Sequence, residues 1–330
     1  MEWRRAQEVR DRVVPEEVTA LLQLALFPGF LFLIVLAFFI EWFDRKLVAK
    51  FQNRYGPLHV GPKGILQPFA DFVKLLSKED ITPEFADRTP FLLMPLLMFA
   101  LAVTPLFSVP IADHSALVSF EGDLIVVMFL MTLTALLLLI GAWVSTNRFS
   151  TIGGIRTGLQ LFGYEIPQNL VMVGPAIATG SLSVSRIVQQ QTGGIWFVLT
   201  QPLGFVVFAI CLLAHLQRVP FDIPEAETEI VGGWLVEFGG RKLALIRLAK
   251  DLELVLAGSL MTSLYLGGTG GPNNLSALVY LLKLLACVFI LSNLRALFAR
   301  YRIDQLLVGA WKYLIPLALL QIGLVEVFPW

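Results

Sequence analysis

Residues 123–144 read DLIVVMFLMTLTALLLLIGAWV and contain no charged side chain after the first position. A helix needs about 20 predominantly apolar residues to cross the hydrocarbon core of a bilayer, and this stretch is long enough to do so. An apolar run of this length indicates a membrane segment rather than part of a soluble domain. The stretch therefore predicts a transmembrane helix.

The rest of the chain has the same character. Hydrophobic residues make up 56% of the 330-residue sequence and charged residues 15%, whereas charged residues make up about 25% of an ordinary soluble domain. Lys and Arg together number 25, as do Asp and Glu, so no net charge favours nucleic acid as a partner. Seven more windows are long and apolar enough to span a bilayer, at residues 18–43, 90–111, 164–184, 195–215, 243–266, 276–298 and 304–328. We predict an all-α polytopic membrane protein with eight transmembrane helices, forming a single membrane domain over residues 1–330.

Basic residues predict the orientation of these helices. The loops that follow helices 1, 3, 5 and 7 contain fifteen Lys and Arg residues, whereas those that follow helices 2, 4 and 6 contain one, Arg186. Because cytoplasmic loops carry the excess of basic residues, the first set is predicted to be cytoplasmic and both termini to lie outside. Residues 1–17 are predicted to form an amphipathic surface helix. Two of the cytoplasmic loops, at residues 44–89 and 216–242, are long and contain most of the unusual chemistry.

The first long loop, 44–89, begins with Asp44, Arg45 and Lys46 and contains Gly-Pro pairs that predict tight turns. Near its middle the sequence predicts a short amphipathic helix, in which Asp71 lies within one turn of two lysines. One interpretation of this stretch is a helix that lies on the membrane surface with its lysines at the lipid headgroups.

The second long loop contains the sequence PFDIPEAETEIVGG, with Glu225, Glu227 and Glu229 close together. Asp222 resembles the capping residue of a helix on which Glu225 and Glu229 share one face while Glu227 points elsewhere. The three carboxylates repel one another, so in a partly dry site the pKa of at least one of them is expected to rise. A solvated acidic loop is the alternative interpretation.

Charges are also predicted at membrane depth. Glu165 opens the fourth predicted helix without a cation within one helical turn, and Arg247 and Asp251 in the sixth have the i,i+4 spacing of an ion pair. Each such charge costs about 2.5–3.5 kcal/mol on insertion scales, so several together usually mark a polar path. A chain of carboxylates that leads from a loop into the helices favours proton movement.

The sequence predicts no metal or redox site built by this chain alone. Its two cysteines, Cys211 and Cys287, lie in separate apolar stretches, and its three histidines are far apart. Iron–sulfur clusters and structural zinc need clustered thiolates or imidazoles. Electrons would therefore have to come from a partner protein docked on the two long loops.

Both loops resemble those of one family, the membrane subunit of respiratory complex I (NADH–quinone oxidoreductase) that is known as H in bacteria and as subunit 1 in mitochondria. The resemblance covers nearly the whole chain after residue 20, and the run from Arg218 to Gly233 is its most specific part. The other matching segments are Arg45-Lys46 and residues 52–57, 61–78 and 164–167.

The resemblance implies a multi-pass subunit of an energy-transducing inner or plasma membrane that joins a hydrophilic electron-transfer arm to a membrane arm. It implies quinone as a substrate, an acidic channel that feeds proton-pumping subunits, and iron–sulfur clusters in partner subunits. The implied partners are the iron–sulfur and quinone-site subunits of the hydrophilic arm, small membrane subunits, antiporter-like subunits and membrane lipids. Carried over by position, the acidic path comprises Asp71, Glu165, Glu225, Glu227 and Glu229, and the quinone chamber or docking surface comprises Asp44, Arg45, Lys46 and Arg54.

Two other hypotheses remain open on the sequence. Residues 238–242 and 249–251 depart from the usual complex I pattern, and the membrane subunit of energy-converting membrane-bound hydrogenases or ferredoxin-driven ion pumps is similar to this chain to about the same degree. Those complexes keep the acidic path but reduce no quinone. The third hypothesis is an independent secondary transporter, but transporters usually show inverted repeats and broken midplane helices, and we find neither in this sequence.

Overall fold

The computed structural model describes residues 16–112, 115–270 and 275–327. Within these ranges the chain is helical and contains no strand, which confirms the predicted all-α class. The surface helix predicted at residues 1–17 falls almost wholly outside the described residues.

The helices in chain order are α2 (Glu16–Ala25), α3 (Phe30–Phe51), α4 (Gln67–Ser77), α5 (Arg88–Val103), α6 (Asp123–Val144), α7 (Arg148–Thr179), α8 (Val184–Thr192), α9 (Phe197–Thr200), α10 (Pro202–His215), α11 (Glu227–Ile230), α12 (Gly240–Tyr265), α13 (Ser276–Leu297), α14 (Ile303–Gly309) and α15 (Ile315–Val327). Three short 3-10 turns lie between them, η1 (Pro62–Gly64), η2 (Thr104–Ser108) and η3 (Gly233–Leu235), and a π-helical segment, η4 (Ala310–Leu314), joins α14 to α15.

Five helical stretches are long and apolar enough to cross a membrane, and the pair α7 and α8, bent by 56° relative to each other, makes a sixth candidate. The five are Leu21–Phe51, Arg88–Ser108, Asp123–Val144, Ser276–Leu297 and Ile303–Val327. The predicted windows 195–215 and 243–266 fall on α9, α10 and α12, which are not among these candidates. Helix α10 has only 14 residues, and α12 has 26 residues but carries its charged side chains in its first half.

Helix α7 begins at Arg148, well before the predicted window 164–184. Hydropathy misses this extension because it contains Gly153 and Gly154 where large apolar residues would otherwise stand. The glycines allow close packing, since a Cβ added at Gly153 would lie 2.7 Å from the backbone nitrogen of Trp234. Small residues at such contacts let the backbones of membrane helices approach each other.

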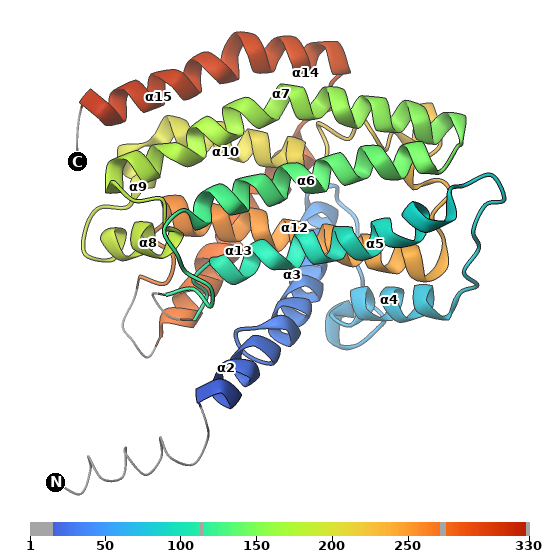
Figure 1. Ribbon diagram of the computed structural model, residues 1–330, viewed down its shortest axis with the longest axis horizontal. Coiled ribbons are helices and arrows are strands. Elements are labelled where there is room, and N and C mark those ends of the chain that lie inside the picture. The colour runs from blue at the N-terminus through green and yellow to red at the C-terminus, as the bar shows by residue number, and fades with distance from the viewer. Residues whose placement is uncertain (1–15, 113–114, 271–274, 328–330) are drawn as a thin grey trace, which may run out of the picture.

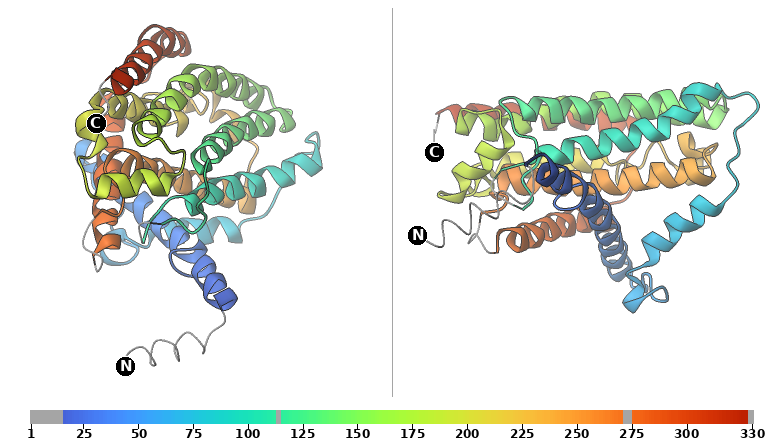
Figure 2. Two further views of the ribbon diagram at one scale, coloured as in Figure 1. Left: turned by 60° about the vertical axis from the view of Figure 1, so that its left-hand side comes forward. Right: turned by 60° about the horizontal axis from the view of Figure 1, so that its bottom comes forward.

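Most of the long helices run side by side in one bundle. Figure 1 shows α5, α6, α7, α10 and α12 nearly parallel, with α3 crossing them at an angle. The views in Figure 2 show the N-terminal part of α3, preceded by α2, projecting from the bundle. Helix α12 lies centrally, where it contacts α3, α4, α5 and α13.

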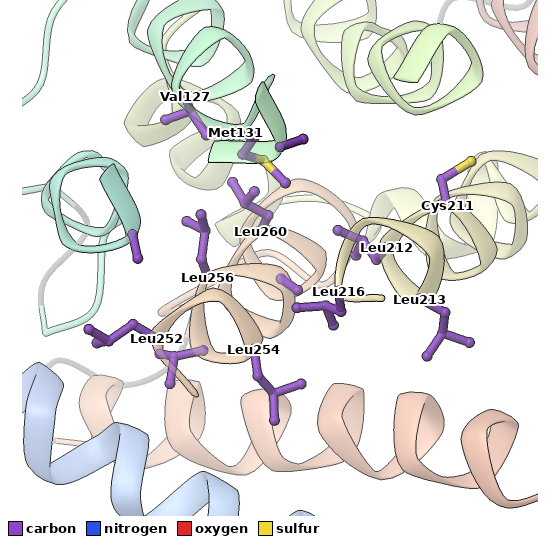
Figure 3. Close-up of a cluster of buried hydrophobic side chains, with 14 of the residues drawn as sticks. Val127, Met131, Cys211, Leu212, Leu213, Leu216, Leu252, Leu254, Leu256 and Leu260 are labelled. Carbon is purple, nitrogen blue, oxygen red and sulfur yellow. The ribbon is translucent and has the colours of Figure 1, made fainter. Parts of the chain in front are cut away.

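The core surrounds the second half of α12, in which every residue from Leu252 to Tyr265 is buried. Figure 3 shows Leu254, Leu256 and Leu260 of this helix among buried side chains from α6 and α10. In a bilayer such packing stabilises the bundle mainly through van der Waals contact, because lipid is as apolar as leucine. The charged first half of α12 is thereby held in place beside the two long loops.

The helix predicted to start at Asp222 is wrong, because α11 begins only after Glu225. The chain reverses here instead of continuing as a helix. Val231 has a left-handed φ of 62°, and a Cβ added at Gly233 would lie 1.9 Å from the carbonyl oxygen of Pro224. A continuous helix would separate these last two positions by about 13 Å, at a rise of about 1.5 Å per residue. The glutamates predicted to share a helical face therefore diverge.

The ion pair predicted between Arg247 and Asp251 is also not among the ion pairs of the described residues. Asp251 instead faces α3, where its side chain forms a hydrogen bond with Glu41. A hydrogen bond between two carboxyl groups requires a proton on one of them. The spacing on α12 was correct, but a neighbouring helix decides which partner the side chain meets.

A buried cation fastens the segment before α5 to α12. Lys242 Nζ lies 2.5 Å from Asp80 Oδ1, 3.0 Å from Thr82 Oγ1 and 5.3 Å from the centre of the Phe91 ring. The lysine side chain is 5% exposed and that of Asp80 is 37% exposed. We expect Asp80→Ala to lower the free energy of unfolding by about 3 kcal/mol, because it leaves a buried ammonium group without its carboxylate.

Lys242→Met is expected to cost less, about 1 kcal/mol, because water can solvate the partly exposed Asp80 that remains. Thermal unfolding of the two variants in the same detergent measures the difference. Equal losses, or a larger loss for Lys242→Met, would contradict this explanation.

Candidate functional site

A charged cavity of about 550 Å³ lies between α3, α12, α13 and loop 216–242. Acidic and basic side chains make up most of its wall. The acids are Glu41, Asp222, Glu225, Glu227 and Asp251, and the bases are Arg45, Arg218, Arg247, Lys250, Arg295 and Arg300. A partly buried group of charges is stable only when the charges pair with one another, so the pairing determines what each residue can do.

Asp44 positions two arginines of the cavity wall. It lies on α3, its side chain is 1% exposed, and its Oδ2 atom accepts hydrogen bonds from Arg218 at 2.5 Å and from Arg295 at 2.6 Å. Its Oδ1 atom accepts a hydrogen bond from Ser292 Oγ at 2.6 Å. Loop 216–242 and α13 are thus both fixed to α3 through one carboxylate.

A second chain of polar contacts connects the cavity to α4. Arg45 donates from Nε to Glu41 Oε1 at 2.6 Å and from a terminal nitrogen to Asp71 Oδ2 at 2.9 Å. Gln67 donates to the other oxygen of Asp71 at 2.9 Å. Although partial burial opposes ionisation, the hydrogen bonds from Arg45 and Gln67 hold the pKa of Asp71 below its usual range. Asp71, predicted in the acidic path, is therefore connected to the cavity through Arg45.

Two of the predicted loop acids, Glu225 and Glu227, line the cavity. Glu225 forms an ion pair with Lys250 of α12. The Lys250 ammonium group also lies 5.0 Å from the centre of the Trp234 ring, which is a favourable cation–π distance. The pair joins loop 216–242 to the charged half of α12.

The third loop acid, Glu229, lies outside this cavity. It forms an ion pair of 2.5 Å with Arg156 of α7, and its side chain is 51% exposed. The hydrogen bond from Arg156 lowers the pKa of Glu229. In contrast, burial raises the pKa of Asp222, which does line the cavity. Among the acids of this loop, Asp222 is thus the one that burial favours in its protonated form.

Glu165 is separate from the cavity as well. It lies on α7, where Thr132 of α6 donates a hydrogen bond to its carboxylate. The preceding residue, Tyr164, is buried and lies 3.3 Å from Nδ1 of His215 through its hydroxyl oxygen. The structure does not bring Glu165 into contact with the other predicted acids.

The remaining predicted residues surround the turn after α3. Lys46 donates a hydrogen bond to the carbonyl oxygen of Pro57 at 2.6 Å, which holds this turn against α3. Arg54 lines a second cavity of about 310 Å³ whose wall also includes Arg45, Tyr55 and Arg295. Arg45 and Arg295 therefore lie between the two cavities.

Comparison with known protein families identifies the chain. The family described as NADH dehydrogenase matches residues 24–326, which is most of the sequence. The chain belongs to the NADH dehydrogenase family. The resemblance found in the two loops is thereby confirmed.

Relatives of this NADH dehydrogenase family chain cover almost its whole length. It is 40% identical to the NADH-quinone oxidoreductase H subunit of Thermomicrobium roseum, over 87% of this chain and 89% of the relative. It is 38% identical to the H subunit of Dehalococcoides mccartyi, over 91% of this chain and 84% of the relative. It is 39% identical to the H subunit numbered 2 of Rhodopseudomonas palustris, over 93% and 95% respectively.

Two charged residues of the cavity in this NADH dehydrogenase family member were not singled out from the sequence. Glu41 is an acid inside the first apolar window, one helical turn before Arg45, and that spacing was an available signal. Arg295 lies at the end of α13, far in sequence from its partner Asp44, so no local pattern indicates it. In the described part of the chain, no group of three or more His, Cys, Asp or Glu side chains is placed to hold a metal ion.

Proposed function

We propose that this chain is the membrane subunit of a complex I-type oxidoreductase that joins the hydrophilic arm to the membrane arm. In this proposal it borders the quinone chamber and begins an acidic path for protons. Family membership and the names of the relatives support a subunit of NADH–quinone oxidoreductase. The eight predicted spans, with both termini outside and the two long loops inside, complete the proposed topology.

The charged cavity of about 550 Å³ is the observation that carries this proposal. It adjoins both long loops, on which the hydrophilic arm is proposed to dock. A negatively charged redox intermediate near the cavity would change the proton affinity of its carboxylates, and each pKa unit corresponds to about 1.4 kcal/mol. Protons would then be redistributed between Glu225, Glu227 and Asp71, and onward to Glu229 and Glu165.

The cavity of about 310 Å³ beside Arg54 is our proposed border of the quinone chamber or of the docking surface. Among the described residues Arg54 forms no ion pair, so its guanidinium group remains able to donate hydrogen bonds to a quinone oxygen or to a partner. The iron–sulfur clusters that would deliver electrons are proposed to lie in the subunits of the hydrophilic arm, with the small membrane subunits and antiporter-like subunits completing the membrane arm.

Arg54→Ala tests the quinone part of this proposal. The variant is expected to lower NADH:quinone reductase activity of the purified assembly about tenfold, because a hydrogen bond from a charged donor is worth about 1.5–3 kcal/mol. Arg186→Ala is the matched control, since Arg186 pairs with Glu121 on an exposed surface away from both cavities. Native electrophoresis must show equal amounts of assembled complex in both variants.

Wild-type quinone reduction by the assembled Arg54→Ala complex would contradict the assigned chamber. An assembly that transfers electrons from ferredoxin or hydrogen and reduces no quinone would instead favour the hydrogenase-type alternative.

A further inference from the structure

Another pair of cavities lies beside α14, away from the cavities described above. The first is an apolar cavity of about 320 Å³ between α7, α10 and η4. Apart from the hydroxyl groups of its tyrosines and the amide of Gln305, its wall is apolar, and it includes Ile210, Cys211, Ala310, Tyr313 and Leu314. The exposed side chain of Tyr313 lies at its rim, so the cavity opens on the outside of the bundle.

The second is a charged cavity of about 330 Å³ that shares Tyr301 with the first. Its wall contains Arg156, Arg300 and Arg302 on the basic side and Glu229 and Asp304 on the acidic side. Three guanidinium groups thus face two carboxylates.

The two carboxylates do not satisfy all three arginines. Glu229 pairs with Arg156, and Asp304 contacts only Nε of Arg302. Arg300 donates a hydrogen bond to the carbonyl oxygen of Asp222 and forms no ion pair with a carboxylate among the described residues. The outer nitrogens of Arg302 and part of the Arg300 fork remain able to bind an anion.

We propose that these two cavities together bind one anionic phospholipid. Its phosphate would lie against Arg300 and Arg302, and one acyl chain would enter the apolar cavity past Tyr301. Basic pockets between membrane helices at the cytoplasmic side bind anionic lipid headgroups, and tyrosine is enriched where one end of a site is apolar and the other polar. A ligand with an anion at one end and a hydrocarbon chain at the other matches this arrangement, whereas a free phosphate would leave the apolar cavity empty.

The π-helical segment η4 supports this assignment independently. Residues Ala310–Leu314 form it, and three of them line the apolar cavity. Single π-turns are rare and often occur at functional sites, because they widen the helix and displace its side chains. The lipid site requires only that the helices are in a membrane, so it stands or falls separately from the redox function proposed above.

Cross-linking with photoreactive lipids tests the proposal. The purified complex is reconstituted in vesicles of phosphatidylcholine that contain a trace of phosphatidylglycerol with a diazirine near the end of one acyl chain, and labelled peptides are identified by mass spectrometry after illumination. We expect labelling of the peptide that contains residues 310–314. The same reagent with a phosphatidylcholine headgroup is expected to label it several-fold less.

Two variants separate the two halves of the site. Gly309 lines the apolar cavity and has no atom within 4 Å of an added Cβ, so Gly309→Phe should fill the space without strain and lower labelling by both lipids at least about tenfold. Arg302→Gln should lower labelling by phosphatidylglycerol about fivefold, the effect of one surface arginine on anionic lipid binding, and leave labelling by phosphatidylcholine unchanged.

Each variant has a matched control. Gly323→Phe on α15 also enters open space but lies outside the cavity, and Arg186→Gln removes an arginine that is likewise exposed and paired with a nearby acid. Neither control should change labelling. Equal labelling in Gly309→Phe and wild type would overturn the acyl-chain site, and equal labelling by both lipids would overturn the headgroup site. Loss of a membrane subunit from Gly309→Phe on native electrophoresis would show that a partner helix occupies the groove, which also overturns the proposal.

Discussion

Replacing Asp44 with alanine is expected to reduce the amount of assembled complex to a small fraction of the wild-type level. Its carboxylate is almost completely buried and neutralises both Arg218 and Arg295 at 2.5 and 2.6 Å. Removing one partner of a buried ion pair costs about 3–5 kcal/mol, because the other charge is left uncompensated. Here two guanidinium groups lose the same partner, and a domain is stable by only about 5–15 kcal/mol in total. Native electrophoresis of membranes that express the variant measures the loss.

Asp44→Asn keeps an oxygen that can accept a hydrogen bond but removes the charge, so its assembly level should lie between those of Asp44→Ala and wild type. Asp304→Ala is the matched control, since Asp304 pairs with an arginine at an exposed position. Exposed pairs contribute about 0–1 kcal/mol, and this variant should assemble normally. Normal assembly of Asp44→Ala would show that the contacts with Arg218 and Arg295 are dispensable.

The second large effect is expected at Lys250. Lys250→Met removes the cation that pairs with Glu225 and faces Trp234, and it leaves a carboxylate in the cavity without its partner. We expect assembly to fall sharply and quinone reductase activity per assembled complex to drop at least about tenfold, since losing a charged hydrogen bond costs about 1.5–3 kcal/mol. Activity in detergent, normalised to assembled complex, measures the effect.

A double-variant cycle separates stability from function. Combining Lys250→Met with Glu225→Gln removes both charges, and we expect it to restore most of the assembly lost in Lys250→Met, with a coupling energy of about 1–3 kcal/mol. Redox-driven ion transport should stay lost, because the proposed proton carrier Glu225 is absent. Restored transport in the double variant would show that this pair is only structural.

Hydropathy alone predicts much of the fold, because the membrane requires apolar side chains along the whole length of a span. The windows 123–144 and 276–298 agree almost to the residue with α6 and α13. The beginning of α7 was missed because its glycines pack well but score poorly on hydropathy. Helix α12 was predicted as a span, yet its charged half is held by neighbours rather than by apolar character.

The candidate site was only partly predictable from the sequence. The charged residues of the two loops were found because their composition and spacing are unusual for a membrane protein. Their partners were not, since Arg295 reaches Asp44 across 251 positions of sequence. The expected helix through Glu225 and Glu229 failed for the same reason: Lys250 of α12 and Arg156 of α7 pull the two glutamates in different directions.

The central claim is that the cavity carboxylates couple electron transfer to ion movement. The direct measurement is the number of ions transported per electron in vesicles that contain the assembled complex. Glu84→Gln, an exposed carboxylate in the first long loop, should keep the wild-type ratio. Glu225→Gln combined with Glu229→Gln, and separately Glu165→Gln, should abolish transport, with electron transfer either lost or uncoupled. Assembled variants that transport ions with the wild-type ratio would contradict the account and leave these carboxylates as structural groups.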